Sequence, residues 1–121
     1  MDITVGEHHF QVIVRTNTLL PHDYSIVLLY THPQYGAVRL RRYHGPLRTA
    51  HENDLEGEIV PAGQPHIHKA TQRYGEKNPE RHDHYAVLAH FTSLEEAWEQ
   101  FIQECALQRP PGDQLPLPLG G

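Results

Sequence analysis

Histidines and cations are concentrated in one stretch of the sequence, Pro65 to Tyr74, which reads PHIHKATQRY. If this stretch is a β-strand, side chains alternate between its two faces, so His66, His68 and Tyr74 share one face while Lys69 and Arg73 share the other. A strand that only fills a core alternates apolar with polar residues, but this one has a single large aliphatic side chain. Packing explains the stretch poorly, and its side chains are candidates for chemistry.

These residue types suit RNA cleavage without a metal ion. Cleavage through the 2′-hydroxyl needs a base for its proton, an acid for the leaving oxygen and a cation beside the charged phosphorane. Because the unperturbed pKa of histidine is close to neutral pH, histidines can fill both proton-transfer roles. We therefore predict a ribonuclease site that needs no cofactor. Its candidate catalytic residues are His51, His66, His68, Arg73 and Tyr74, and its candidate substrate-binding residues are Arg39, Arg41 and Lys69.

A metal site is a second interpretation of the same stretch. His66 and His68 lie two apart, so on a strand their imidazoles project to one side and can bind a single zinc or other divalent ion. A His-X-His pair also arises by chance in a chain with 11 histidines. The remaining ligands would come from His51, Glu56, Glu58, His82 or His84.

A third class of function is a non-catalytic binding module, such as an accessory subunit or an inhibitor of a larger complex. In that interpretation His66, His68 and Tyr74 hydrogen-bond to backbone and hold a polar sheet face in place. Arg39 and Arg41 then keep an edge strand from pairing with another chain. A homodimer is also compatible with an open sheet face.

Length and composition limit these alternatives. The chain has 121 residues, which is enough for one domain with a modest core. Its formal charge is −5, which is less basic than a general nucleic-acid binder, but most of its Lys and Arg lie in residues 39–81. The single cysteine, Cys105, excludes an intramolecular disulfide and a multi-cysteine zinc site. No apolar segment is long enough for a membrane span and no secretory signal is evident, so we expect no membrane contact and a cytoplasmic location.

The elements that would position these residues follow from hydrophobic periodicity. Alternating or continuous apolar runs predict strands at 9–16, 25–32, 37–44, 66–74 and 85–91, with a long loop at 47–64. A helix is predicted over 93–107, because its apolar residues recur at helical spacing. Either Thr92 with Glu95 or Ser93 with Glu96 makes a capping box at its start. The apolar face of the helix contains Leu94, Ala97, Trp98, Phe101, Ile102 and Cys105.

These elements predict a single α+β domain over residues 1–109. An antiparallel sheet of about five strands, with the C-terminal amphipathic helix packed on one face, buries both apolar surfaces in two layers. The other sheet face stays open, and Arg39, Arg41 and Tyr43 are expected to converge there with the histidine strand. Residues 110–121 form a flexible tail rich in Pro, Leu and Gly.

The order of the strands, the HIHKATQRY segment, His51 followed by Glu56-Gly57, and an aromatic-rich final helix together resemble a known group of proteins. The chain is similar over residues 36–107 to small uncharacterised bacterial proteins of the TumE-like toxin group, which are encoded beside antitoxins or in mobile elements. The resemblance implies a toxin-like activity and a protein partner such as an antitoxin or a larger complex. RNA remains the expected substrate.

Overall fold

The computed structural model describes residues 1–46 and 49–105. Within them a six-stranded antiparallel sheet has the order β1-β2-β3-β4-β7-β8, and a separate hairpin pairs β5 with β6. The predicted tail at 110–121 and the last two residues of the predicted helix lie outside the described residues. The strands are β1 (Asp2–Val5), β2 (His8–Thr16), β3 (Tyr24–His32), β4 (Gly36–His44), β5 (His51–Asn53), β6 (Glu58–Val60), β7 (His66–Lys69) and β8 (Ala86–Leu88). The helices are α1 (Gln72–Lys77), the short 3-10 helix η1 (Pro79–Arg81) and α2 (Leu94–Cys105).

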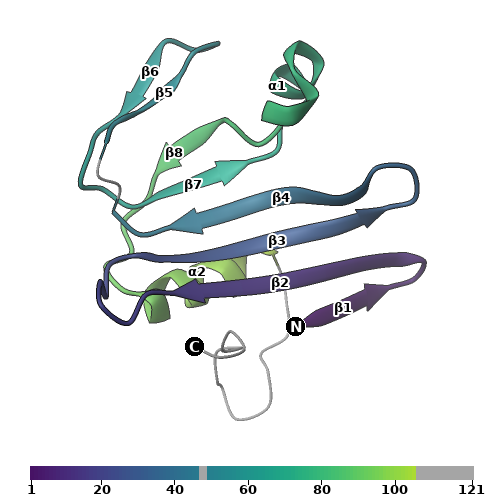
Figure 1. Cartoon of the computed structure of the whole chain (residues 1–121), viewed down its shortest axis with the longest axis horizontal. Coiled ribbons are helices and arrows are strands. Elements are labelled where there is room, and N and C mark those ends of the chain that lie inside the picture. The colour runs from purple at the N-terminus through teal and green to yellow at the C-terminus, as the bar shows by residue number, and fades with distance from the viewer. Residues whose placement is uncertain (47–48, 106–121) are drawn as a thin grey trace.

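Helix α2 packs across one face of the sheet, as the sequence predicts (Figure 1). The Ser93–Glu96 capping pair forms: the Ser93 hydroxyl accepts the Glu96 N–H at 3.2 Å, and the Glu96 carboxylate accepts the Thr92 N–H at 3.1 Å. The apolar face of α2 buries its aromatic residues against the sheet. The core it completes includes Val12, Val14, Ile26, Leu28, Tyr43, Ile67, Phe91, Trp98 and Phe101.

The α+β class is confirmed, but the sheet has six strands and not five. The additional strand is β1, which pairs antiparallel with β2. Asp2–Val5 is too short for its periodicity to be informative, and it pairs because Gly6 turns the chain back with a φ of 60°. Met1 extends the pairing, since its carbonyl oxygen accepts the Val12 N–H at 2.8 Å.

A β-bulge in the pairing of β3 with β4 changes which side chains of β4 face the helix. Leu28 is opposite Arg41 and Leu29 is opposite Arg39, so Leu40 has no partner and the alternation shifts by one residue. Tyr43 is therefore fully buried under α2, with its ring 5.3 Å from that of Phe101. The predicted convergence of Arg41 and Tyr43 on the open face is wrong.

The predicted strand over 66–74 is also too long. Strand β7 ends at Lys69, and the Thr71 hydroxyl accepts the Tyr74 N–H at 3.4 Å as the N-cap of α1. A threonine cap that satisfies a free N–H favours a helix start over continuation of the strand. Arg73 and Tyr74 consequently belong to α1 and do not alternate with His66 and His68.

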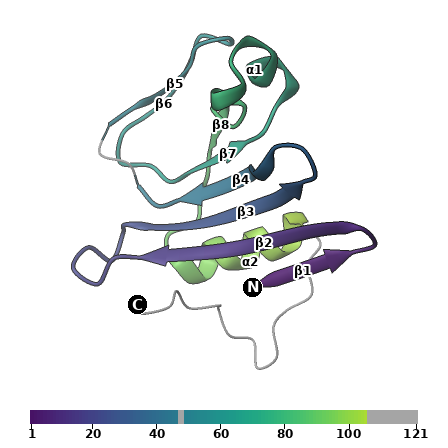
Figure 2. The ribbon, with the colours of Figure 1, turned by 45° about the vertical axis from the view of Figure 1, so that its right-hand side comes forward.

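The region predicted as a long loop contains the β5–β6 hairpin. The hairpin turns at Gly57, whose φ of 70° suits glycine. Figure 2 shows the hairpin and α1 at the β7–β8 end of the sheet, at a distance from α2. No helix among the described residues is long and apolar enough to cross a membrane.

Candidate active site

Strand pairing brings three histidines together on the sheet face opposite α2. His44 on β4 is directly opposite His66 on β7, and their rings stack with centroids 5.2 Å apart. His68 is opposite Arg42, and its ring lies 4.8 Å from that of His66 and 5.6 Å from that of His44. These four residues define the buried histidine cluster. His66 and His68 are only 1% and 6% exposed.

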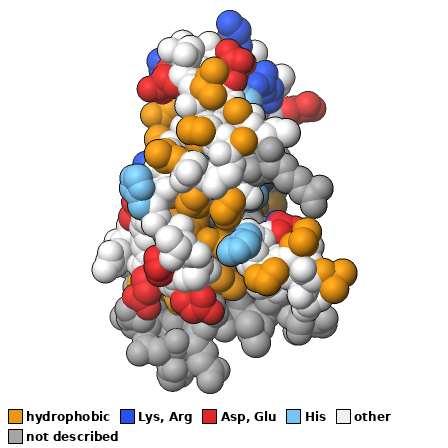
Figure 3. All heavy atoms as spheres, turned by 90° about the vertical axis from the view of Figure 1, so that its left-hand side faces the viewer, with side chains coloured by type: hydrophobic (Ala, Val, Ile, Leu, Met, Phe, Trp, Pro, Cys, Tyr) orange, Lys and Arg blue, Asp and Glu red, His pale blue; other side chains and the backbone are white. Residues whose placement is uncertain are grey.

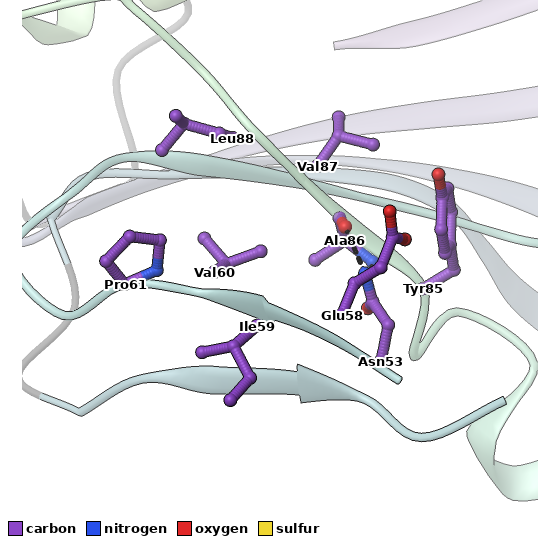
Figure 4. A pocket seen from close by; sticks show the side chains of 9 residues that line it. All are labelled: Asn53, Glu58, Ile59, Val60, Pro61, Tyr85, Ala86, Val87 and Leu88. Carbon is purple, nitrogen blue, oxygen red and sulfur yellow. Dashed lines mark hydrogen bonds between the residues drawn. The ribbon is translucent and has the colours of Figure 1, made fainter. Parts of the chain in front are cut away.

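A buried side chain anchors the β5–β6 hairpin beside this cluster. The buried Asn53 donates to the Ala86 carbonyl at 2.7 Å and accepts the Ala86 N–H at 2.9 Å, so its amide replaces a neighbouring strand at the edge of β8. Figure 4 shows Asn53 hydrogen-bonded directly to Ala86. Both residues line a cavity of about 260 Å³ between β6 and β8. Because His51 lies two residues before Asn53, the same contact brings the His51 ring to 4.8 Å from that of His68.

A second group of side chains continues from His51 toward α1. The His51 ring is 4.5 Å from that of His84, and the Tyr74 ring is 5.3 Å from that of His84. The Tyr74 hydroxyl donates to Glu56 at 2.7 Å, and Arg73 forms an ion pair with the same carboxylate. His51, His66, His68, Arg73 and Tyr74, the five predicted catalytic residues, thus belong to one continuous set of contacts.

Burial keeps the histidines of the cluster neutral. Desolvation, followed by the charge of Arg42 or of neighbouring histidines, lowers the pKa of His66 to about 3, of His68 to about 2 and of His44 to about 4. Desolvation also lowers the pKa of His51, and His84 adds to the effect. At neutral pH these imidazoles are therefore uncharged and carry one proton each.

Hydrogen bonds fix which nitrogen carries that proton. His51 Nε2 lies 2.8 Å from the His84 carbonyl oxygen and 3.1 Å from the Asn53 amide oxygen, so it must donate, and Nδ1 keeps a lone pair. In the same way His68 Nδ1 donates to the Asp83 carbonyl at 3.1 Å. His51 is partly exposed, so its free nitrogen is the better placed of the two to accept a proton from a ligand.

His84 has a different environment from the buried histidines. Its Nε2 lies 2.8 Å from the Asp54 carboxylate, which makes an ion pair when the imidazole is protonated, and 2.8 Å from the Glu52 carbonyl oxygen. The Arg81 guanidinium lies 3.1 Å from His84 Nδ1, which accepts from it, and 3.3 Å from the Asp54 carboxylate. A histidine, a carboxylate and a guanidinium therefore lie together at the surface beside His51.

A buried carboxylate, that of Asp83, contacts the cluster through Arg42. Asp83 is almost fully buried and pairs with Arg42 at 2.7 Å and Arg39 at 3.1 Å. Arg39, a predicted substrate-binding residue, thus lies on the face that carries the histidines. Arg41 and Lys69 do not, because they are opposite each other on the side that α2 covers, where Arg41 lies 3.6 Å from Glu104.

Patterns in the sequence did not place His44, Arg42, Asp54 or Asp83 in the site. His84 and Glu56 were considered only as possible metal ligands. His44 and Arg42 are near His66 and His68 only because β4 pairs with β7, which local patterns do not reveal. Within residues 1–46 and 49–105, no three His, Cys, Asp or Glu side chains are placed to hold a metal ion.

No protein-family model, curated protein or solved structure matches this chain. We therefore infer the function of the protein from the geometry of the site.

Proposed function

We propose that the protein is a metal-independent ribonuclease of a toxin-like kind that acts on RNA in the cytoplasm. The observation that carries the proposal is the placement of His51. Its Nε2–H is used by the His84 carbonyl, its Nδ1 keeps a lone pair, and its ring lies 4.5 Å from that of a second histidine which contacts a carboxylate. A neutral histidine base beside a second histidine is the pairing that cleavage through a 2′-hydroxyl needs.

In the proposed reaction His51 Nδ1 removes the proton of the 2′-hydroxyl. The 2′-oxygen then attacks the adjacent phosphorus, and the bond from phosphorus to the 5′-oxygen breaks to leave a 2′,3′-cyclic phosphate. The His84 imidazolium, whose Nε2–H stays on Asp54, gives its Nδ1 proton to the 5′-oxygen after Arg81, which lies 3.1 Å from Nδ1, has moved onto the phosphate. Arg73 and Arg81 are partly exposed cations beside these groups and stabilise the charged phosphorane.

The buried histidines have a positioning role in this proposal. His66 and His68 are hidden from solvent and their pKa values are far below neutral, so they are poor proton donors for a large substrate. Their rings support the His51 ring from the sheet side. The sequence predicted that His66 and His68 act as base and acid. In this proposal they position His51 and do not transfer protons themselves.

Cleavage of a defined single-stranded RNA oligonucleotide tests the proposal. The wild-type protein should cleave RNA with and without a chelator, and it should leave DNA of the same sequence intact because DNA lacks the 2′-hydroxyl. His51→Ala should lower the rate by roughly 10²–10⁴, the usual contribution of acid–base catalysis. His90→Ala is the matched control, since His90 is exposed and outside the site. Equal cleavage by His51→Ala and wild type would contradict the assignment.

A protein partner without catalysis is the second candidate function. It is favoured by Ile59 and Leu88, which are 67% and 42% exposed at the cavity between β6 and β8. The space-filling view in Figure 3 shows hydrophobic side chains running down one face of the molecule. A stable complex with an antitoxin or another protein on size exclusion, without RNA turnover, would favour this candidate.

A homodimer would be seen in the same size-exclusion experiment. RNA cleavage that is lost when a chelator is added would favour zinc or another divalent metal bound at His66 and His68.

A further inference from the structure

A second cavity, of about 490 Å³, lies between the β3–β4 turn and the segment that follows β7. One wall comes from the turn and the start of β4, and the other comes from α1 and η1. Its residues are Tyr35, Ala37, Val38, Gly75, Pro79 and His82. The lining consists of two aromatic rings, Tyr35 and His82, three apolar side chains and one glycine. The cavity therefore suits a flat and largely apolar group.

Tyr35 is the unusual residue of this cavity. It is 76% exposed, which leaves most of a large aromatic ring in water. The ring is nevertheless held in place, because it packs against His32 with centroids 4.7 Å apart. His32 is fixed in turn, since its Nδ1 accepts the backbone N–H groups of Gln34 at 3.0 Å and Tyr35 at 3.2 Å. Tyr35 is therefore a preorganised aromatic surface with area free for a ligand.

The opposite wall of the cavity is held equally firmly. His82 Nε2 lies 2.7 Å from the Arg39 carbonyl oxygen and its Nδ1 lies 3.1 Å from that of Pro79. The His82 carbonyl oxygen also accepts the Thr71 N–H at 2.9 Å. These contacts tie the α1–η1 segment to β4, so the cavity does not depend on a loose loop.

We propose that this cavity is a subsite for one nucleobase of the RNA substrate, with the base stacked on Tyr35. The inference rests on the proposed ribonuclease function. Single-stranded RNA is commonly recognised by stacking its unpaired bases on aromatic side chains, with nearby cations following the phosphates. The His32–Tyr35 pair provides the stacking surface.

The α1–η1 wall of the cavity carries three cations, Arg73, Lys77 and Arg81, against two acids, Glu76 and Glu80. Lys77 is exposed at the last turn of α1, two residues before Pro79, and Arg81 and Arg73 are on the same segment. On the face shown in Figure 3, most visible Lys and Arg side chains lie at the upper end, where Figure 1 places α1. The acidic outer residues of α2 are on the other side of the sheet.

The cavity also adjoins the proposed catalytic pair. His82 lines the cavity and is only two residues before His84, so their Cα atoms are at most about 7 Å apart. A nucleotide next to the scissile phosphate could place its base on Tyr35 while the phosphate lies near His84 and Arg81. The subsite would therefore contribute to substrate binding without taking part in proton transfer.

The test is binding of a fluorescent, fully 2′-O-methylated RNA oligonucleotide, which lacks the nucleophilic hydroxyl and so reports affinity alone. Tyr35→Ala should raise its Kd by about 5- to 100-fold, because stacking on one aromatic ring contributes about 1–3 kcal/mol. Tyr35→Phe keeps the ring and should stay within about twofold of wild type. Leu19→Ala, at an exposed position on the β2–β3 loop, is the control and should not change the Kd.

The outcomes separate this subsite from the proposed function. If Tyr35→Ala raises the Kd for RNA as expected but RNA is never cleaved, the subsite is supported and the ribonuclease proposal is wrong. Cleavage that depends on His51, with a Kd and KM that Tyr35→Ala leaves unchanged, overturns the subsite and keeps the ribonuclease. No measurable binding of single-stranded RNA by the wild-type protein overturns the subsite as well.

Discussion

Asn53 makes two hydrogen bonds to the backbone of Ala86, one to its carbonyl oxygen at 2.7 Å and one from its N–H at 2.9 Å. A single side-chain amide thereby completes the hydrogen bonding at the edge of β8 and fixes the hairpin that carries His51. The position of His51 beside His68 depends on this pair.

Replacement of Asn53 by Ala should therefore destabilise the fold. It leaves two buried backbone groups without partners, each costing about 1–3 kcal/mol, so we expect a loss of about 2–5 kcal/mol in the free energy of unfolding. Urea denaturation measures the loss. Gln11→Ala, an exposed change on β2, is the control and should stay within about 0.5 kcal/mol of wild type. A loss of only a few tenths for Asn53→Ala would mean that the hairpin is held by other contacts.

Phe101 should be a major contributor to the core. It is fully buried, with its ring 5.3 Å from that of Tyr43 and 5.7 Å from that of Trp98. Phe101→Ala should lower the free energy of unfolding by about 3–5 kcal/mol, since it removes buried apolar area and leaves a cavity. The exposed Gln103→Ala on the same helix provides the comparison in urea unfolding. Similar small effects from both changes would show that α2 is not part of the core.

The ion pairs of Asp83 should also be important for stability. Asp83→Asn would leave Arg42 and Arg39 without their carboxylate in a largely buried setting. Removing one partner of a buried ion pair costs about 3–5 kcal/mol, and the partial exposure of both arginines places the expected loss near the lower end. Thermal unfolding monitored by circular dichroism would measure it. The same change at Asp54, which is exposed, should have little effect on unfolding.

Stability should fall as the solution becomes more acidic. Burial, with the charge of Arg42 and the neighbouring histidines, holds the pKa values of His44, His66 and His68 at about 4, 3 and 2, below the ordinary value of 6.5. The unfolded chain therefore binds more protons than the folded chain below pH 6.5. The stabilisation is complete above that pH and is lost progressively as the pH falls toward the folded values.

Between pH 7 and pH 5 each of these histidines should reduce the free energy of unfolding by about 2 kcal/mol. Urea unfolding at several pH values in this range tests the expectation, because most carboxylates remain ionised there. His68→Gln should reduce the slope, whereas His90→Gln should not. A wild-type stability that is independent of pH over this range would show that the cluster is open to solvent.

Local patterns in the sequence were sufficient for α2 and for the strands with strong alternation. The spacing of Trp98, Phe101 and Ile102 places them on one face of a helix, and the Ser93–Glu96 cap marks the start of that helix. The His66 and His68 pair was recognisable as a candidate site because its residue types are unusual for a core strand. These features depend only on residues close in the chain.

Tertiary structure alone decided that His44 and Arg42 join that pair and how His51 reaches it. His44 and Arg42 reach it through the register of β4 with β7, and His51 reaches it through the contact of Asn53 with Ala86. The bulge opposite Leu28 and Leu29 moved Arg41 to the helix side, which no alternation pattern in β4 itself reveals. Register and bulges depend on the packing of two strands together, and a one-residue shift moves every following side chain to the other face. The sequence by itself therefore determined α2, the long strands and the chemical types of the candidate residues, whereas strand pairing decided which of their side chains meet.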